Sequence, residues 1–201
     1  MNKKPIYILG LGNPGAEYAD TRHNAGRAAL ELLAHDNNFS SFKEEKKLQA
    51  LVSEGYIAKK PVLLLLPETF MNNSGRTTTA LKIPSKKQIT ERVIVVHDDL
   101  DLPLGTVKIM FNRGTAGHKG IESIVRSLKT KEFTRIRIGI AKASDIKKSQ
   151  SKAIVHKIVT GPLSPAEKTV LKKGVKKAAS AVEAVLCYGL SKAMNAVHSE
   201  K

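Results

Sequence analysis

The sequence predicts an α/β fold, a single domain in which a twisted mixed β-sheet is flanked by helices on both faces. Short apolar runs typical of buried strands alternate along the chain with segments of helical periodicity. The length of 201 residues suits one hydrophobic core, so residues 1–201 are expected to form one domain. No internal repeat interrupts this pattern.

The N-terminal third is expected to supply three strands and a helix. An apolar run predicts the first strand over Ile6–Leu11, and an Ala/Leu-rich pattern predicts a helix from Ala25 to about Asp36. Two further strands are expected over Leu48–Val52 and Tyr56–Leu66, with a turn at Glu54-Gly55. The second of them ends in four leucines and has no polar face, which indicates a central strand buried on both sides.

The middle of the chain is expected to continue the alternation of strands and helices. After a short helix that ends near Leu81, a second fully apolar strand is expected at Val93–Val96, ending in the polar run His97–Asp101. Thr106–Phe111 is expected to be the hairpin partner or neighbour of that strand. The spacing of apolar residues predicts a helix over Ile121–Leu128.

The C-terminal third is expected to contain one strand and two helices. Charged residues alternate with isoleucine over Arg135–Ile140, which is typical of a strand with one face in the core and one basic face. A long helix is expected from Ser164 to about Tyr188, because Ser164 and Glu167 have the spacing of a capping box. A last short helix is expected over Leu190–Val197.

The charge balance is the strongest compositional signal. Thirty-four Lys and Arg against eighteen Asp and Glu give a net charge of +16, which favours a polyanionic partner, nucleic acid before membrane. The alternative is a lysine-rich surface that only confers solubility. The longest apolar run, Val62–Leu66, is too short to cross a bilayer, so a cytoplasmic protein without a membrane partner is expected. The single cysteine, Cys187, suits a reducing compartment and is expected to be buried in a helix.

The glycine-rich stretch after the first strand is the first candidate for a functional site. Its G-x-G-x-x-G spacing at Gly10–Gly15 matches a dinucleotide fingerprint, but that motif needs a helix to begin at the third glycine and an acidic residue roughly 20 residues further on. Helical periodicity resumes only at Ala25, so the spacing is interpreted as coincidental. The loop instead places Asn13, Tyr18 and His23 after a strand end, where α/β proteins carry their chemistry.

Three polar segments follow predicted strands, and they contain His23, Asn72 and Asp98. If these strands are parallel, their carboxyl ends converge on one crevice and the three residues meet there. A neutral imidazole with a carboxylate on its other nitrogen is a general base for activating water. The alternatives are a surface or capping role for His23, a turn-forming role for Asp98 and Asp99, and a divalent-cation cluster that includes Asp101. No G-x-S-x-G or H-E-x-x-H motif supports covalent catalysis or zinc proteolysis.

Basic residues are expected to form a platform beside this crevice. Arg135 and Arg137 lie two apart on a predicted strand, so both would project from one face. Preceding elements add further basic residues, namely Lys108, Arg113, Lys119 and Arg126. Such a platform holds phosphates, and the alternative is a solvated charged face. With 4% aromatic residues and no Trp, phosphate contacts to a folded RNA are favoured over base stacking.

Six segments together resemble the bacterial-type peptidyl-tRNA hydrolase family, in its order and spacing. They are G-L-G-N-P-G-x-x-Y at 10–18, T-R-H-N-A-G at 21–26, P-E-T-F-M-N-N-S-G at 67–75, V-V-H-D-D-L-D-L-P-L-G at 95–105, G-T-A-G-H-K-G at 114–120 and F-x-R-I-R-I-G-I at 133–140. The resemblance implies hydrolysis of the ester that links a peptide to the 3′-terminal ribose of tRNA, by a monomer acting on peptidyl-tRNA. Because base-activated water suffices for such an ester, neither a metal nor a cofactor is expected.

The resemblance also implies roles for individual residues. The catalytic set it implies is His23 as the base, Asp98 as its carboxylate partner, and Asn13 and Asn72 as amides that orient substrate and water. The implied substrate-binding set is Tyr18, Phe70, Met71, Asn72, His118 and Lys119. The implied grip on tRNA phosphate is Arg137, with Arg135, Lys108 and Arg113 as further phosphate-binding residues.

Two positions depart from the family pattern. The family usually has Asn where this chain has Lys119, and a lysine of the phosphate grip is replaced by Met110. These departures and the high positive charge keep a second hypothesis open, an RNA-binding protein on the same fold in the manner of organellar splicing relatives. Retention of both His23 and Asp98 favours the enzyme, because a binding protein needs no poised base.

Overall fold

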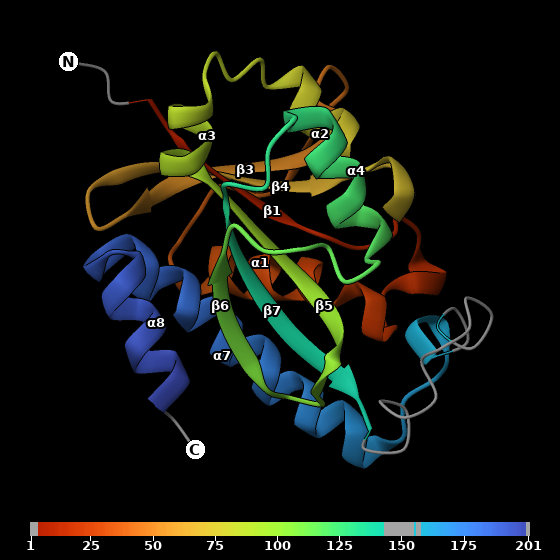
Figure 1. The fold of residues 1–201 in the computed structure, drawn as a ribbon. Helices are drawn as coiled ribbons and strands as arrows, with labels where there is room; N and C mark the ends of the chain where they lie inside the picture. Colours follow the sequence, from red (N-terminus) through yellow and green to blue (C-terminus); the bar gives the residue numbers. More distant parts are fainter. Residues whose placement is uncertain (1–3, 143–154, 156–157, 200–201) are drawn as a thin grey trace.

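The computed structural model describes residues 4–142, 155 and 158–199, and within these residues seven strands form one mixed sheet in the order β2-β3-β4-β1-β5-β7-β6 (Figure 1). The strands are β1 (Ile6–Gly10), β2 (Lys43–Glu45), β3 (Ala50–Ile57), β4 (Lys60–Pro67), β5 (Val93–Pro103), β6 (Val107–Phe111) and β7 (Thr134–Ala141). The four inner strands β4, β1, β5 and β7 run parallel, and the remaining pairs are antiparallel.

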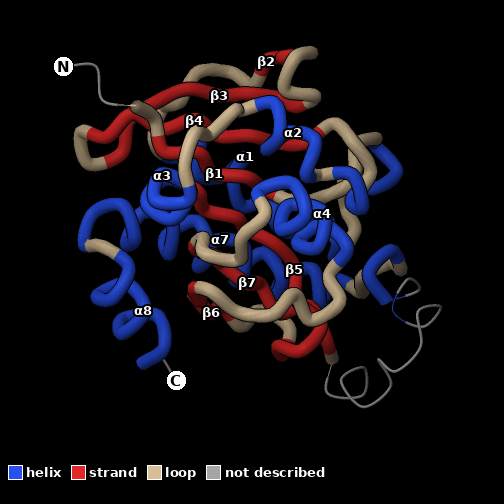
Figure 2. The backbone as a smooth tube through the Cα atoms, turned by 45° about the horizontal axis from the view of Figure 1, so that its top comes forward, coloured by secondary structure: helices blue, strands red, loops and turns tan. Residues whose placement is uncertain are grey.

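Helices cover both faces of the sheet, as the sequence predicts. They are α1 (Ala25–Asp36), α2 (Gly75–Ala80), α3 (Lys86–Arg92), α4 (Lys119–Leu128), α7 (Pro165–Tyr188) and α8 (Leu190–Ser199), with the 3₁₀ turns η1 (Ala16–Tyr18), η2 (Arg22–Asn24) and η3 (Met71–Asn73). Figure 2 shows α2 and α4 in front of the sheet and α1 and α7 behind it. None of the described helices is both long enough and apolar enough to span a bilayer.

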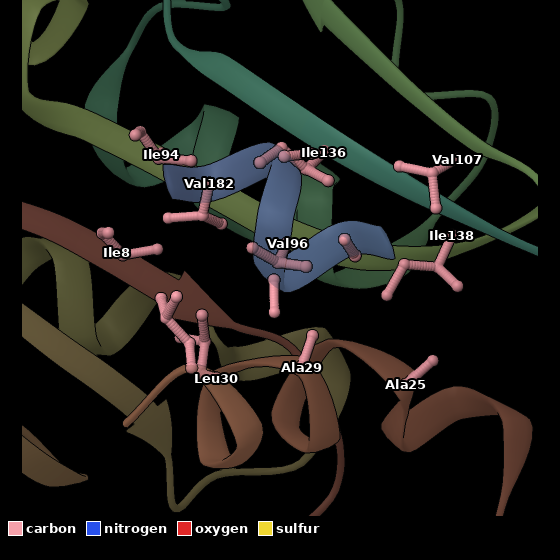
Figure 3. Packing of buried hydrophobic residues seen from close by; sticks show 14 of the residues in the cluster. Ile8, Ala25, Ala29, Leu30, Ile94, Val96, Val107, Ile136, Ile138 and Val182 are labelled. Carbon is pink, nitrogen blue, oxygen red and sulfur yellow. The ribbon is translucent and has the colours of Figure 1, made fainter. Parts of the chain in front are cut away.

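Side chains that alternate along the strands form a separate core on each face. Ile8 of β1 packs with α1 and with Val182 of α7, as Figure 3 shows. The next residue, Leu9, packs on the opposite face with Ile121 and Ile124 of α4. Because successive side chains of a strand point to opposite faces, an uninterrupted apolar run is what a strand covered by helices on both sides requires.

The β3–β4 hairpin differs from the prediction, which placed its turn at Glu54-Gly55. The turn lies at Ala58 and Lys59, both in the left-handed region at φ 49° and 59°. Gly55 lies inside β3, where a Cβ atom would come within 2.6 Å of the Phe39 ring. The glycine therefore marks a close approach of an aromatic ring, and not a turn.

The pairing of β5 and β6 also differs from the prediction. β5 extends to Pro103, so His97–Asp101 continue the strand, and β6 pairs with β7, which lies between it and β5. The polar residues His97, Asp98 and Asp99 remain buried within a strand because each has polar partners nearby. β2 and α3 were not predicted, and the short β2 is exposed and highly charged.

The C-terminal helices agree with the prediction except at the cysteine. Both hydrogen bonds of the capping box between Ser164 and Glu167 are present at the start of α7. The helix ends at Tyr188, and α8 follows after Gly189. Cys187, in the last turn of α7, is exposed, so its expected burial is wrong.

Candidate active site

The candidate site lies where the neighbouring parallel strands β1 and β5 end. The loop after β1 carries His23 in η2, and the adjacent strand β5 carries Asp98. Gly26, in the first turn of α1, allows this close approach, because a Cβ atom there would lie 2.4 Å from the carbonyl oxygen of Val96. The sequence thus brings the turn that carries His23 directly against β5.

Two histidines share the carboxylate of Asp98. Nδ1 of His23 lies 2.9 Å from Oδ1 and 3.0 Å from Oδ2 of Asp98, and Nε2 of His118 lies 2.9 Å from the same Oδ1. The side chains are 14%, 2% and 9% exposed for His23, Asp98 and His118. The contact between His23 and Asp98 that the sequence could only suggest is therefore present, and His118 is an additional partner.

The hydrogen bonds define which nitrogen of each ring carries a proton. Nδ1 of His118 accepts the backbone N–H groups of Gly120 and Ile121 and so caps α4, which leaves the proton on Nε2 for donation to Asp98. Nδ1 of His23 likewise donates to Asp98. In the neutral ring Nε2 of His23 therefore carries no proton, and it has no partner among the described residues, so it can accept one.

Burial and pairing act in opposite directions on the two charged groups. Burial by itself raises the pKa of Asp98, but the facing His23 and His118 outweigh it and hold the pKa well below its usual range. Burial by itself lowers the pKa of His23, but attraction and hydrogen bonding to Asp98 raise it above 6.5, against a smaller lowering by Lys119. Asp98 therefore stays ionised and makes the imidazole of His23 more basic.

A third histidine, His97, lies behind this pair and was missed in the sequence. Its Nδ1 donates to the carbonyl oxygen of Asp98 at 2.7 Å, and its ring lies edge-on to His118 with centroids 4.8 Å apart. Burial, followed by the nearby His118, lowers the pKa of His97 to about 3. His97 is therefore neutral and supports the ring of His118 without adding a competing charge.

Two asparagines fix the loop beside His23. Oδ1 of Asn24 accepts the backbone N–H of Asn13 at 2.8 Å, and Nδ2 of Asn24 donates to the carbonyl of Asn13 at 2.9 Å. Oδ1 of Asn13 accepts the backbone N–H of Met71 at 2.8 Å. The Nδ2 donor of Asn13 has no partner among the described residues, and Asn13 also lines a recess of about 240 Å³ between this loop and α1.

The cluster of His23, Asp98 and His118 has ligand atoms within 4.8 Å of one another, as a metal site would. The tautomer of His118 is unfavourable for metal binding at this cluster. A metal on Nε2 of His118 would displace its proton to Nδ1, which already accepts two backbone N–H groups. Asp99, part of the alternative acidic cluster, instead pairs with Arg137 and accepts the N–H of Asp101. These donor sets do not fit a metal ion.

The residues expected to bind the peptide part of the substrate differ in their exposure to solvent. Phe70 is 60% exposed and packs edge-on to the half-buried Tyr18, with centroids 6.5 Å apart. Asn72 and Lys119 are exposed. Met71 is 4% exposed and its side chain packs in the core. Its contribution is the backbone N–H that holds Asn13.

The expected basic face of β7 is only partly accessible, because Arg135 is buried and Arg137 is half-buried. Arg135 is 2% exposed and donates to the carbonyl groups of Arg113 and Gly114. Arg137 is held through Nε by Asp99, and its Nη atoms have no partner among the described residues. Lys108 lies opposite Arg137 in the β6–β7 register and is exposed, as is Arg113. The guanidinium of Arg135 is therefore occupied by backbone carbonyl groups. Lys108 and Arg137, in contrast, lie side by side as a cross-strand pair.

The fold and site define an α/β protein in which a histidine contacts a buried carboxylate at the carboxyl ends of parallel strands, an arrangement typical of hydrolases. The family model for peptidyl-tRNA hydrolase matches residues 7–201. The chain belongs to the peptidyl-tRNA hydrolase family, as its six sequence segments predict.

Individual relatives match over almost the whole chain. The peptidyl-tRNA hydrolase of Syntrophomonas wolfei is 42% identical over 94% of this chain and 97% of its own. The peptidyl-tRNA hydrolase of Mannheimia succiniciproducens is 39% identical over 96% of each. The crystal structure of peptidyl-tRNA hydrolase from Acinetobacter baumannii superposes with a TM-score of 0.86 at 32% identity, over 98% of this chain and 96% of that one.

Proposed function

We propose that this protein hydrolyses the ester bond between the peptide and the 3′ ribose of peptidyl-tRNA, and so recycles tRNA from stalled or aborted translation. Membership of the family supports this activity. The observation that carries the chemistry is the pairing of His23 Nδ1 with both oxygens of Asp98, which leaves Nε2 free to accept a proton.

In the proposed mechanism, Nε2 of His23 takes a proton from a water molecule whose oxygen attacks the ester carbonyl carbon. Asp98 stabilises the imidazolium that forms and keeps the ring in one orientation. When the bond between the carbonyl carbon and the ribose oxygen breaks, His23 returns its proton to that oxygen. The products are free tRNA and the peptide acid.

Asn13 supplies the donor for the negative charge that develops on the carbonyl oxygen. Met71 holds Oδ1 of Asn13, so the amide presents Nδ2 in a fixed orientation. A donor that is already oriented stabilises the transition state without a reorganisation cost. Asn72, on the exposed turn next to Met71, is assigned to orienting substrate and water.

The nucleic-acid part of the substrate is assigned to Arg137 and Lys108. Asp99 fixes the Arg137 guanidinium through Nε and leaves its two Nη groups for a phosphate oxygen pair. Lys108 lies opposite Arg137 in register and supplies a second cation in place of the lysine lost at Met110. We further propose that the protein acts as a monomer in the cytoplasm, without a metal or a cofactor.

A hydrolysis assay on N-blocked aminoacyl-tRNA tests the proposal. Wild-type protein is expected to release tRNA, and His23→Ala is expected to lose at least about a hundredfold in kcat, the scale of general base catalysis. Equal release by both proteins would reject the mechanism. If the wild type binds the tRNA tightly but does not hydrolyse it, the RNA-binding alternative holds instead.

A further inference from the structure

The first turn of α7 makes side-chain contacts with Asp20 and Arg22, which lie just before the proposed base His23. Arg22 is only 5% exposed; its Nη2 donates to Oε1 of Glu167 at 3.1 Å and its Nη1 to the carbonyl of Ile158 at 3.1 Å. The side chains of the ion pair are 6% and 13% exposed, unlike most surface ion pairs. A buried charge next to His23 is therefore held by residues more than a hundred positions further along the chain.

Glu167 is a fixed anchor for this contact. Its Oε2 accepts the backbone N–H of Ser164 at 2.8 Å within the capping box, and its Oε1 also accepts Nζ of Lys142 at 2.6 Å. The hydrogen bond from Lys142, followed by that from the Ser164 backbone, lowers the pKa of Glu167 to about 2. The carboxylate is thus ionised at physiological pH and tied to the helix end.

The turn η2 depends on outside contacts for its orientation. It is a three-residue 3₁₀ turn without a side-chain cap, and such short turns have little stability of their own. Each of its residues is held by a different part of the protein: Arg22 by Glu167, His23 by Asp98, and Asn24 by Asn13. These are three separated anchors, and among the hydrogen bonds of the described residues Arg22 is the one that links the turn to α7.

We propose that Arg22 and Glu167 are positioning residues for His23: their ion pair sets the rotation of η2 so that Nδ1 of His23 meets both oxygens of Asp98. The kinetic part of this inference rests on the proposed function. Loss of the pair lets the turn rotate and weakens the contact between His23 and Asp98. Small displacements of a catalytic group lower kcat more than they affect substrate binding.

Arg22→Met is the variant that tests the inference. A fall in kcat of about tenfold is expected, with KM within about twofold of wild type. The charged or titratable groups facing His23 are Asp98, His118 and Lys119. Because Asp98 raises the pKa of His23, a weaker contact moves the acid limb of the pH–rate profile to lower pH. Simple loss of the Arg22 cation would move it the opposite way.

Lys168→Met is the matched control. Lys168 lies in the same turn of α7 and contacts the same loop through Asp20, but that pair is 43% and 85% exposed. An exposed pair contributes little, so this variant is expected to keep kcat within about twofold and the pH profile unchanged. Glu167→Gln, which can still accept the Ser164 N–H, is the second variant and is expected to lower kcat with KM retained.

NMR titration of the His23 ring gives a readout that does not depend on activity. A lower pKa of His23 in Arg22→Met, together with the lower kcat, supports the inference. An unchanged profile, or a lower kcat that only follows a smaller folded fraction, overturns it. If Arg22→Met does not fold, unchanged kcat in Glu167→Gln overturns it. If instead His23→Ala retains wild-type activity, the proposed role of His23 as the base fails, and the titration of His23 in Arg22→Met still decides whether Arg22 positions the ring.

Discussion

The carboxamide of Asn13 is fixed to the backbone of Met71, because the Met71 N–H donates to Oδ1 of Asn13 at 2.8 Å. A backbone N–H needs an acceptor, so the amide cannot be reversed and Nδ2 must be the group left for substrate. This contact joins the loop after β1 to the turn after β4, whose parallel strands are neighbours in the sheet. Orientation of the proposed oxyanion donor is therefore set by the fold.

Asn13→Asp separates the two functions of this amide. The carboxylate still accepts the Met71 N–H, so thermal stability is expected to stay near wild type. The Nδ2 donor is lost and a negative charge faces the developing oxyanion, so kcat is expected to fall by about a hundredfold to a thousandfold. Asn13→Ala is the control, because it removes the acceptor as well and is expected to cost about 1–3 kcal/mol of stability. Wild-type kcat in Asn13→Asp would contradict the assignment.

His118 has two contacts that can be tested separately. Its Nδ1 caps α4, and its Nε2 donates a hydrogen bond to Asp98. Asn is a good N-cap, so His118→Asn is expected to retain α4 while losing the hydrogen bond to Asp98. We expect near-wild-type stability with a clearly lower kcat, measured by thermal melting and steady-state kinetics. Ser85→Ala removes the cap of the distant α3 and serves as the control, with a stability loss of about 1 kcal/mol and unchanged kcat. Full activity in His118→Asn would mean that Asp98 needs only one histidine.

Lys119 is expected to tune the pH dependence of the reaction. Burial lowers the pKa of His23, Asp98 raises it above 6.5, and Lys119 lowers it. The pH above which the imidazole of His23 is neutral therefore depends on burial, Asp98 and Lys119 together. In Lys119→Asn the acid limb of kcat/KM is expected to move to higher pH by less than about one unit, with an equal or higher plateau. Lys129→Asn makes the same charge change at the far end of α4 and should leave the limb in place. A large loss of plateau activity in Lys119→Asn would mean that Lys119 contributes directly to substrate binding or catalysis.

The order of the elements and the two-sided core were predictable, because apolar periodicity reports which side chains face a core. Ile8 and Leu9 are adjacent, and each lies in the core of a different face. The same signal failed beyond Val96, where His97, Asp98 and Asp99 are polar and yet buried in β5. Burial of such residues depends on partners from distant segments, which periodicity in one segment does not contain.

In the candidate site, too, the contacts that depend on strand order were predictable and those that depend on distant backbone partners were not. The convergence of His23 and Asp98 followed from strand ends, and their contact is present. Burial of Arg135 was not predictable, because its partners are the backbone carbonyls of Arg113 and Gly114, which have no sequence signature. For His118 a signal did exist: a histidine placed directly before a helical pattern is a candidate cap, and that reading would have placed it at the start of α4.

Arg137 is expected to bind phosphate through the two Nη groups that Asp99 leaves free. Arg137→Ala should weaken tRNA binding and reduce the slope of log K against log salt concentration by about one, because one phosphate contact is lost. Lys87→Ala removes an equal charge from the exposed surface of α3 and should leave the slope unchanged. Binding measured over a series of salt concentrations distinguishes the two. An unchanged slope in Arg137→Ala would exclude Arg137 from the phosphate grip and leave Lys108 as the remaining candidate on these strands.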